Sequence, residues 1–321
     1  MADQEKGCLP KCGYGLLGLC CTSCLSGPCR RSPFDEAGGG GYCGQDSDWI
    51  VARNLTERVS RESLQAMALL RDALERASGP GNRIEASRLE EMRLLLSPFF
   101  RGESELLGRL YPERAFPFLH TLKFPCGSWG AALLDAAAAP PGTHDIVAQL
   151  ESALRLSALA LAAEALLGEL AGRAPEETGL ELPEKPAPLL ILVRDGEGLP
   201  DEGRDAAFRE IEAACRATAL IGKLDHVGQL PALGRAIYEK WGVPASLSGS
   251  LAVVASPSVT RGLGALALGF SLAPLPGYPV QGSPCVGNYL THNLKERFGH
   301  AYLPLCPDEE PGAQIMRGLL P

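Results

Sequence analysis

Seven of the eleven cysteines lie within the first 43 residues, at positions 8, 12, 20, 21, 24, 29 and 43. Disulfide bonds do not account for this crowding. The number is odd, two of the thiols are adjacent, and the N-terminus lacks the basic and apolar regions of a secretory signal, so we expect a reducing, cytoplasmic location. Closely spaced thiolates in such a compartment indicate a bound metal.

The spacing of four of these cysteines fits a [4Fe-4S] cluster, because short intervals let one loop wrap a cube of iron and sulfide. The turn at Gly27-Pro28 and the glycines at 38–41 allow the chain to return to its last ligand. Structural zinc is the alternative, since C-x2-C is half of a zinc site, but zinc leaves more thiols unexplained. The proposed intrachain ligands are Cys21, Cys24, Cys29 and Cys43.

Cys12 and Cys20 remain as a pair, which is half the number of ligands that a cluster needs. A two-fold homodimer would supply the other half from the same residues of its second subunit. We therefore expect a homodimer with an intersubunit iron–sulfur cluster. The alternative is that this pair binds nothing; Cys8 has no partner in either arrangement.

Two runs of sequence resemble the N-terminal segment of the anaerobic nickel-dependent carbon monoxide dehydrogenases: CGYGLLGLCCTSCLSGPCR from Cys12, and YCGQDSDWIVARN ending at Asn54. A weaker resemblance, LGFSLAPLPGYPVQGSP from Leu268, is to the last α/β domain of that family. The resemblance implies that Cys12 and Cys20 bridge the D cluster between subunits. It also implies that Cys21, Cys24, Cys29 and Cys43 hold the B cluster.

The nickel–iron–sulfur active site of that family is not recognisable here, because most of its ligands belong to a central portion that this shorter chain lacks. The nearest counterpart of one ligand turn, Leu224 to Gly228, contains no thiol, so a nickel cofactor is doubtful. The family's proton-conducting histidines correspond to Ala66 and Leu69, which do not titrate. We expect a dimeric electron-transfer subunit that works with a redox partner, either ferredoxin-like or an oxidoreductase.

Two other functions stay open. A working or divergent carbon monoxide dehydrogenase would recruit ligands from His226 or from four dispersed cysteines, which could also form a third cluster or be ordinary buried thiols. Of these, Cys285 is the best single candidate, because it follows a Gly-Ser-Pro turn. In a non-redox alternative the clusters are structural and the α/β domain binds a small ligand. The four cysteines are Cys126, Cys215, Cys285 and Cys306.

The composition describes a folded chain: 45% of residues are hydrophobic, 21% are charged, and the net charge is −8. This acidic balance disfavours nucleic acid as a partner. The most apolar stretch, residues 146–170, is interrupted by Gln149, Glu151, Arg155 and Glu164, so it predicts a buried helix and no membrane span.

The hydrophobic periodicity predicts an α+β/α/β fold: a cluster-binding segment (1–48), a helical domain (49–173), a linker (174–188) and a Rossmann-like parallel α/β domain (189–321). The first long helix should bury Leu64, Met67, Leu70 and Leu74. A capping-box-like start at Asn82 to Glu85 should begin the second helix. Expected helices are 47–77, 82–97, 103–111, 129–138, 145–171, 202–218, 230–241, 259–269 and 285–298, and expected strands are 189–193, 251–254, 270–273 and 301–303.

Overall fold

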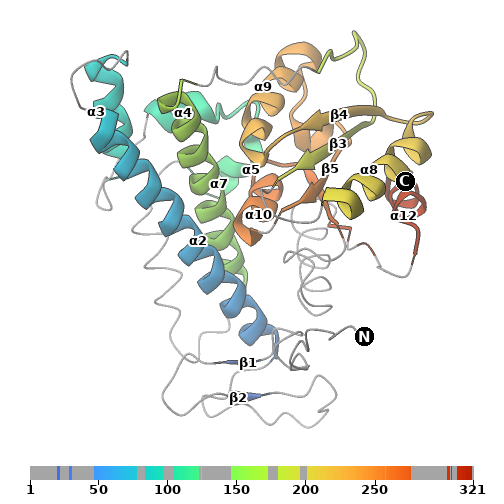
Figure 1. Ribbon diagram of the computed structural model, residues 1–321, viewed down its shortest axis with the longest axis horizontal. Helices are drawn as coiled ribbons and strands as arrows, with labels where there is room; N and C mark the ends of the chain where they lie inside the picture. Colours follow the sequence, from blue (N-terminus) through green and yellow to red (C-terminus); the bar gives the residue numbers. More distant parts are fainter. Residues whose placement is uncertain are drawn as a thin grey trace, which may run out of the picture.

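The chain combines a helical part with a parallel β-sheet (Figure 1). This mixed helical and α/β architecture is the fold class that the sequence predicts, whereas the division into domains stays a prediction. The computed structural model describes residues 20–21, 29–30, 47–77, 84–96, 105–122, 124, 146–172, 180–195, 201–256, 258–275, 302–303, 305 and 309–319. The predicted helices at 129–138 and 285–298 lie outside these ranges.

Two long helices, α2 (Ser47–Ala77) and α7 (Ile146–Leu170), pack side by side and run in parallel. The Thr56 hydroxyl donates to the carbonyl of Gln149 at 3.3 Å, and the Ser63 hydroxyl donates to the carbonyl of Leu156 at 3.1 Å. Both pairs are 93 residues apart, so the two helices advance together, turn by turn. In the described part of the chain, α7 alone is long and apolar enough to cross a bilayer, and 72% of that stretch is buried within the protein.

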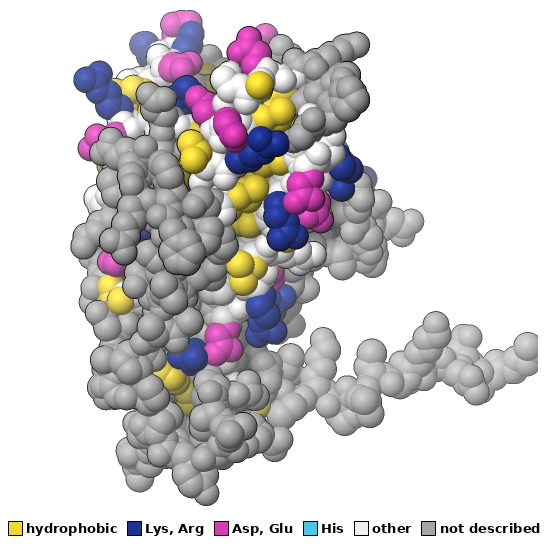
Figure 2. Space-filling view, turned by 90° about the vertical axis from the view of Figure 1, so that its left-hand side faces the viewer, with side chains coloured by type: hydrophobic (Ala, Val, Ile, Leu, Met, Phe, Trp, Pro, Cys, Tyr) yellow, Lys and Arg dark blue, Asp and Glu magenta, His cyan; other side chains and the backbone are white. Residues whose placement is uncertain are grey.

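The buried face of α2 differs at one position from the predicted stripe. Met67, Leu70 and Leu74 are at most 4% exposed, but Leu64 is 43% exposed. The neighbouring Ser63 takes the inward position, because its hydroxyl can bond to α7. Figure 2 shows the side of the molecule that lies at the left in Figure 1. Among the described residues on this side, basic and acidic side chains alternate with small, separate hydrophobic areas.

Three short helices follow α2: α3 (Ala86–Leu95), α4 (Glu105–Leu110) and α5 (Pro117–Thr121). The predicted capping box at 82–85 is wrong, since Glu85 is itself the N-cap of α3 and makes no capping bond through its side chain. Helix α5 is absent from the helices that the sequence predicts. Pro117 occupies the start of the helix, where its fixed φ favours helix formation.

The sheet contains β3 (Leu189–Arg194), β4 (Leu220–Leu224), β5 (Ser250–Ala255) and β6 (Ser271–Pro274), all parallel, in the order β4-β3-β5-β6. The strand order reverses between β3 and β5. Successive strand residues face opposite cores: Leu190 and Leu192 pack toward α8 (Asp201–Cys215) and α12 (Pro311–Leu319), and Ile191 packs toward the side of α7.

Strand β4 and helix α12 are absent from the sequence-based prediction. In β4 a glycine and a lysine dilute the β signal, and Gly222 lies close to Leu180, since a Cβ there would lie 3.0 Å from Cδ2 of that side chain. Helix α8 ends at Cys215, earlier than predicted, which leaves room for β4. The predicted strand at 301–303 is reduced, within the residues described there, to a parallel bridge between Tyr302 and Leu272.

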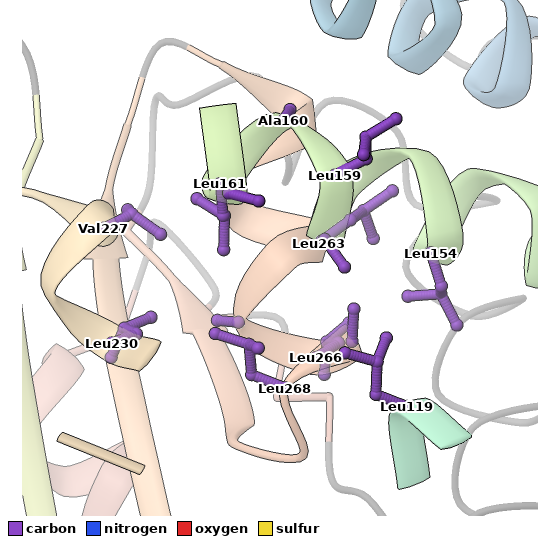
Figure 3. Close-up of a cluster of buried hydrophobic side chains, with 14 of the residues drawn as sticks. Leu119, Leu154, Leu159, Ala160, Leu161, Val227, Leu230, Leu263, Leu266 and Leu268 are labelled. Atoms are coloured by element: carbon purple, nitrogen blue, oxygen red, sulfur yellow. The ribbon is translucent and has the colours of Figure 1, made fainter. Parts of the chain in front are cut away.

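The helices and one face of the sheet share one hydrophobic core (Figure 3). It is built where α7 meets α10 (Val259–Ala267), the turn η1 (Val227–Gln229) and α9 (Leu230–Trp241). The preceding extended segment joins it: Leu180 and Leu182 pack against this core, and the Trp241 indole donates to the carbonyl of Pro183 at 2.8 Å. Two leucines of the predicted linker therefore contact the core, whereas most of the other described linker residues are exposed.

Close packing of α10 on α7 depends on Gly264. A Cβ at this position would lie 2.5 Å from Cδ1 of Leu161. We expect Gly264→Ala to lower the free energy of unfolding by about 1–3 kcal/mol, because the core must shift to admit the methyl group. The matched control is Gly168→Ala, whose new Cβ meets nothing within 4 Å and should stabilise α7 by about 0.5–1 kcal/mol. Urea denaturation compares them, and equal midpoints for the two variants would contradict the expectation.

Candidate functional site

The cysteine-bearing segment forms a small antiparallel sheet of β1 (Cys20–Cys21) and β2 (Cys29–Arg30). The register pairs Cys21 with Cys29 and Cys20 with Arg30. Two of the four predicted intrachain ligands are thus directly opposed along the backbone. Neighbouring strand positions belong to opposite faces of a sheet, so positions 20 and 21 are on different faces.

A hydrogen bond attaches this sheet to the beginning of α2. The Asn54 side-chain amide donates to the carbonyl of Cys20 at 2.9 Å, and Cys20 itself is half-buried. One turn earlier on the helix, Trp49 is buried, and the Arg53 guanidinium lies over its ring at 5.4 Å from the ring centroid. Strand β1 is therefore hydrogen-bonded to a helix that is also part of the main core.

Most of the other predicted ligands fall outside the described residues, including Cys12, Cys24, Cys43, Cys126, Cys285 and Cys306. Within the described ranges, no three His, Cys, Asp or Glu side chains are grouped so that they could hold a metal ion. The ligand set Cys21, Cys24, Cys29 and Cys43 consequently stays a prediction, as does the intersubunit pair of Cys12 and Cys20.

Two dispersed candidates are described, and the fold separates them. Cys215 is fully buried at the end of α8 in the apolar core, where burial raises the pKa of its thiol. Its carbonyl accepts a bond from the backbone N–H of Ala219, directly before β4. His226 is exposed just after β4, where it is the N-cap of the turn η1. Because they lie at opposite ends of this strand, they do not form one ligand set.

A buried polar cluster occupies the carboxyl ends of β3 and β5, where the strand order reverses and α/β proteins commonly bind ligands. Asp195 follows β3 and is only 1% exposed, and it accepts a bond from the Ser256 hydroxyl that follows β5. The Arg261 guanidinium of α10 lies 3.1 and 3.2 Å from the two Asp195 oxygens. Its Nε donates to Glu164 of α7 at 2.8 Å.

Helix α2 contributes a third carboxylate to this cluster. Glu62 accepts bonds from the Ser258 hydroxyl at 2.7 Å and from the backbone N–H of Thr260 at 2.9 Å, at the beginning of α10. Arg58, one turn before it on α2, pairs with its other oxygen at 3.1 Å. The helix N-terminus at the strand-order reversal is thus already bonded to a carboxylate of the same chain, so the arrangement joins α2, α7, α10 and the sheet.

The buried polar residues at the strand-order reversal are called the switch-point cluster: Asp195, Ser256, Arg261, Glu164 and Glu62. The charges within this cluster influence one another. Burial raises the pKa of Glu164; Arg261 opposes this shift, and the nearby Asp195 and Glu62 add to it. Burial would also raise the pKa of Glu62, but the bonds from Thr260, Ser258 and Arg58 outweigh it and lower that pKa. For Arg261, burial would lower the pKa, and the two carboxylates raise it. The positive charge of the Arg261 guanidinium therefore compensates the negative charges of Asp195 and Glu164.

Sequence reasoning missed this cluster, although part of it left a signal. Asp195 and Ser256 each follow a predicted buried strand, and polar residues after parallel strands meet at one sheet edge. Glu62 and Glu164 gave no such signal. They lie on helices that are far from α10 in the sequence: 198 residues separate Glu62 from Thr260.

The lowered pKa of Glu62 predicts an acid-dependent contribution to stability. A carboxyl group with a depressed folded-state pKa stabilises fully above its ordinary pKa of about 4.3 and loses this effect as the pH falls through the folded-state value. We expect Glu62→Gln to lower the free energy of unfolding at neutral pH by about 1–2 kcal/mol and to change it little once Glu62 is protonated. Urea midpoints across the acid range measure this, and a pH-independent difference would contradict it.

The cysteine-rich N-terminal sequence has recognisable relatives, although no protein-family model matches the chain. Carbon monoxide dehydrogenase 1 of Methanosarcina mazei is 42% identical over 72 residues, which cover 22% of this chain and 12% of that relative. The carbon monoxide dehydrogenase of Rhodospirillum rubrum is 53% identical over 51 residues, which are 16% of this chain and 8% of the relative. The matches thus span about a tenth of the relatives' own length, and they confirm the predicted resemblance to carbon monoxide dehydrogenases.

Solved structures give a weaker similarity. The as-isolated, nickel-free carbon monoxide dehydrogenase of Thermococcus sp. AM4, produced without the CooC maturase, aligns with 85% of this chain and 52% of its own length. The sequence identity is 16% and the TM-score is 0.43.

Proposed function

We propose that this chain, which is related over part of its length to carbon monoxide dehydrogenases, is an iron–sulfur electron-transfer subunit. Cys21, Cys24, Cys29 and Cys43 would hold an intrachain [4Fe-4S] cluster. Cys12 and Cys20 would share an intersubunit cluster in a homodimer. The protein would be cytoplasmic and would exchange electrons with a ferredoxin-like protein or an oxidoreductase.

The observation that carries this proposal is the backbone register of β1 and β2. A cube needs four thiolates on one small surface, and the register brings two of the proposed ligand positions opposite each other. It also assigns Cys20 to the other face of the sheet, as separate roles for adjacent cysteines require. The proposed ligands are all cysteines, and thiolates suit an iron–sulfur cluster better than a hard cation.

When bound, the cluster would supply a one-electron carrier. The chain's own residues would fix its position: Asn54 holds the Cys20 backbone, and Trp49 is buried at the beginning of the same helix, α2. A rigid attachment favours electron transfer, because it limits the rearrangement that accompanies each change of charge. We therefore assign to α2 the role of connecting the cluster segment to the main core.

The enzyme alternative, a divergent carbon monoxide dehydrogenase, needs nickel ligands outside the N-terminal segment. Of its candidates, Cys215 and His226 lie at opposite ends of β4, and Cys215 is buried in an apolar core. Nickel content and carbon monoxide-dependent reduction of viologen dye separate the two functions. We expect neither nickel nor dye reduction, and a stoichiometric nickel content with dye reduction would favour the enzyme.

Anaerobic purification with iron and sulfide analysis, electron paramagnetic resonance and light scattering tests the main proposal. A brown dimer with reversibly reducible clusters is expected, and a colourless, iron-free monomer would refute it. Clusters that resist reversible reduction would favour the non-redox alternative, in which they are structural.

A variant at Cys20 separates the two clusters. Cys20→Ser should remove the intersubunit cluster and weaken the dimer but leave the intrachain cluster, because only the former uses this thiol. Light scattering and iron analysis on the anaerobic variant measure both effects. Loss of all iron, or an unchanged dimer with unchanged iron, would contradict the separate roles of Cys20 and Cys21.

A further inference from the structure

The pairing of Cys21 with Cys29 has a chemical consequence for the iron-free chain. Directly opposed residues of antiparallel strands have Cα atoms about 4.5–5.5 Å apart. A disulfide bond needs a Cα separation of about 4.4–6.8 Å. The backbone register therefore satisfies the main geometric requirement for a bond between these two cysteines without a rearrangement of the strands.

We infer that Cys21 and Cys29 are a cross-strand redox pair that closes into a disulfide when the iron-free chain meets dioxygen. The two thiols lose two protons and two electrons, one S–S bond forms, and dioxygen is reduced to hydrogen peroxide. A dithiol reductant reverses the step by returning two electrons and two protons, and it becomes a disulfide itself. The pairing stands on the register alone, and only its effect on cluster assembly rests on the proposed function.

The register favours this pair over the neighbouring cysteine. Cys20 is opposite Arg30 and belongs to the other face, and the bond that its carbonyl accepts from Asn54 links β1 to α2. Cys215 is fully buried among apolar side chains of a different core. The main alternative disulfide joins Cys21 to Cys24, because these two residues form a C-x-x-C motif, which is common in redox proteins. Bond mapping decides between these pairs.

A closed pair would control iron loading. Both thiols are proposed cluster ligands, so one disulfide would remove half of the intrachain set in a single step. Iron and sulfide could then enter only after reduction. The reversible bond would also protect both sulfurs from further oxidation by dioxygen, which is irreversible beyond the sulfenic acid stage in most proteins.

Differential alkylation of the full-length chain tests the pairing. The protein is depleted of iron with a chelator, exposed to air or kept anaerobic, blocked with N-ethylmaleimide, reduced, and labelled with iodoacetamide. Trypsin cleaves after Lys11 and Arg30, so a single peptide, Cys12 to Arg30, contains both partners and their competitors. We expect that, in the air-exposed sample, Cys21 and Cys29 both carry iodoacetamide instead of N-ethylmaleimide. Cys20 and Cys24 should still carry N-ethylmaleimide.

Variants sharpen the test. Cys29→Ser should abolish the protection of Cys21 if these two residues pair, whereas Cys24→Ser should leave it intact. Protection of Cys21 together with Cys24, or no protection in air, would overturn the inference. Mapping does not require that iron binds. A disulfide in a chain that never takes up iron would therefore support the pair and refute the proposed function. Iron binding without the disulfide would support the proposed function and refute the pair.

Discussion

Replacing Cys29 by serine is expected to leave the anaerobically purified chain without its intrachain [4Fe-4S] cluster, a loss of four iron atoms per subunit. Cys29 lies in β2, directly opposite Cys21, so the substitution removes one of two ligand positions that the hairpin brings together. A serine hydroxyl is a poor substitute, because iron–sulfur clusters are held by thiolates. Iron and sulfide analysis, together with the sulfide-to-iron charge-transfer absorbance, measures the loss.

The matched control is Cys215→Ala, which removes a thiol that is fully buried in the core behind the sheet. This variant should retain its iron, since its thiol packs among apolar side chains and its pKa is raised by burial. Equal iron contents in Cys29→Ser and in the unsubstituted chain would remove Cys29 from the ligand set. An equal loss of iron in both variants would show that the loss reports general destabilisation.

The long helices could be predicted from sequence because their apolar residues repeat with the helical period over many turns. Helix α2 begins and ends where predicted, and α9 spans residues 230–241 as expected. Strand β4 could not be predicted in this way. Its glycine lies beside Leu180, a contact that a local sequence pattern does not contain. Helix α5 was missed because a proline that starts a helix looks the same in sequence as one that breaks it.

Two features of the candidate sites depend on contacts that are distant in sequence. Cysteine spacing predicted a metal site, but it did not predict which cysteines are opposed. That follows from the register of β1 and β2, and the bond from Asn54, 34 residues from Cys20, links this small sheet to α2. The switch-point cluster brings together residues of α2, α7, α10 and the sheet edge. A single sequence identifies such residues as polar, but it does not identify their partners.

The largest change in stability is expected from the cation of that cluster. Arg261→Met should lower the free energy of unfolding by about 3–5 kcal/mol, because it leaves the carboxylate of Asp195 buried without an opposite charge. It also removes the partner of Glu164, whose pKa is already raised by burial. Urea denaturation at neutral pH, followed by far-ultraviolet circular dichroism, measures the change. A decrease below about 1 kcal/mol would contradict the role of Arg261.

Three further variants, Arg58→Gln, Asp195→Asn and the double variant of Arg261→Met with Asp195→Asn, separate the effect of the buried charge from that of the lost side-chain packing. Arg58→Gln removes an exposed guanidinium from the same cluster and should cost less than about 1 kcal/mol, since its pair with Glu62 lies on the solvent side of α2. Combining Arg261→Met with Asp195→Asn should recover part of the loss, because an amide at position 195 can still accept a bond from Ser256 without carrying a charge. If the double variant is as unstable as the sum of both single variants, packing accounts for the loss and the unpaired carboxylate does not.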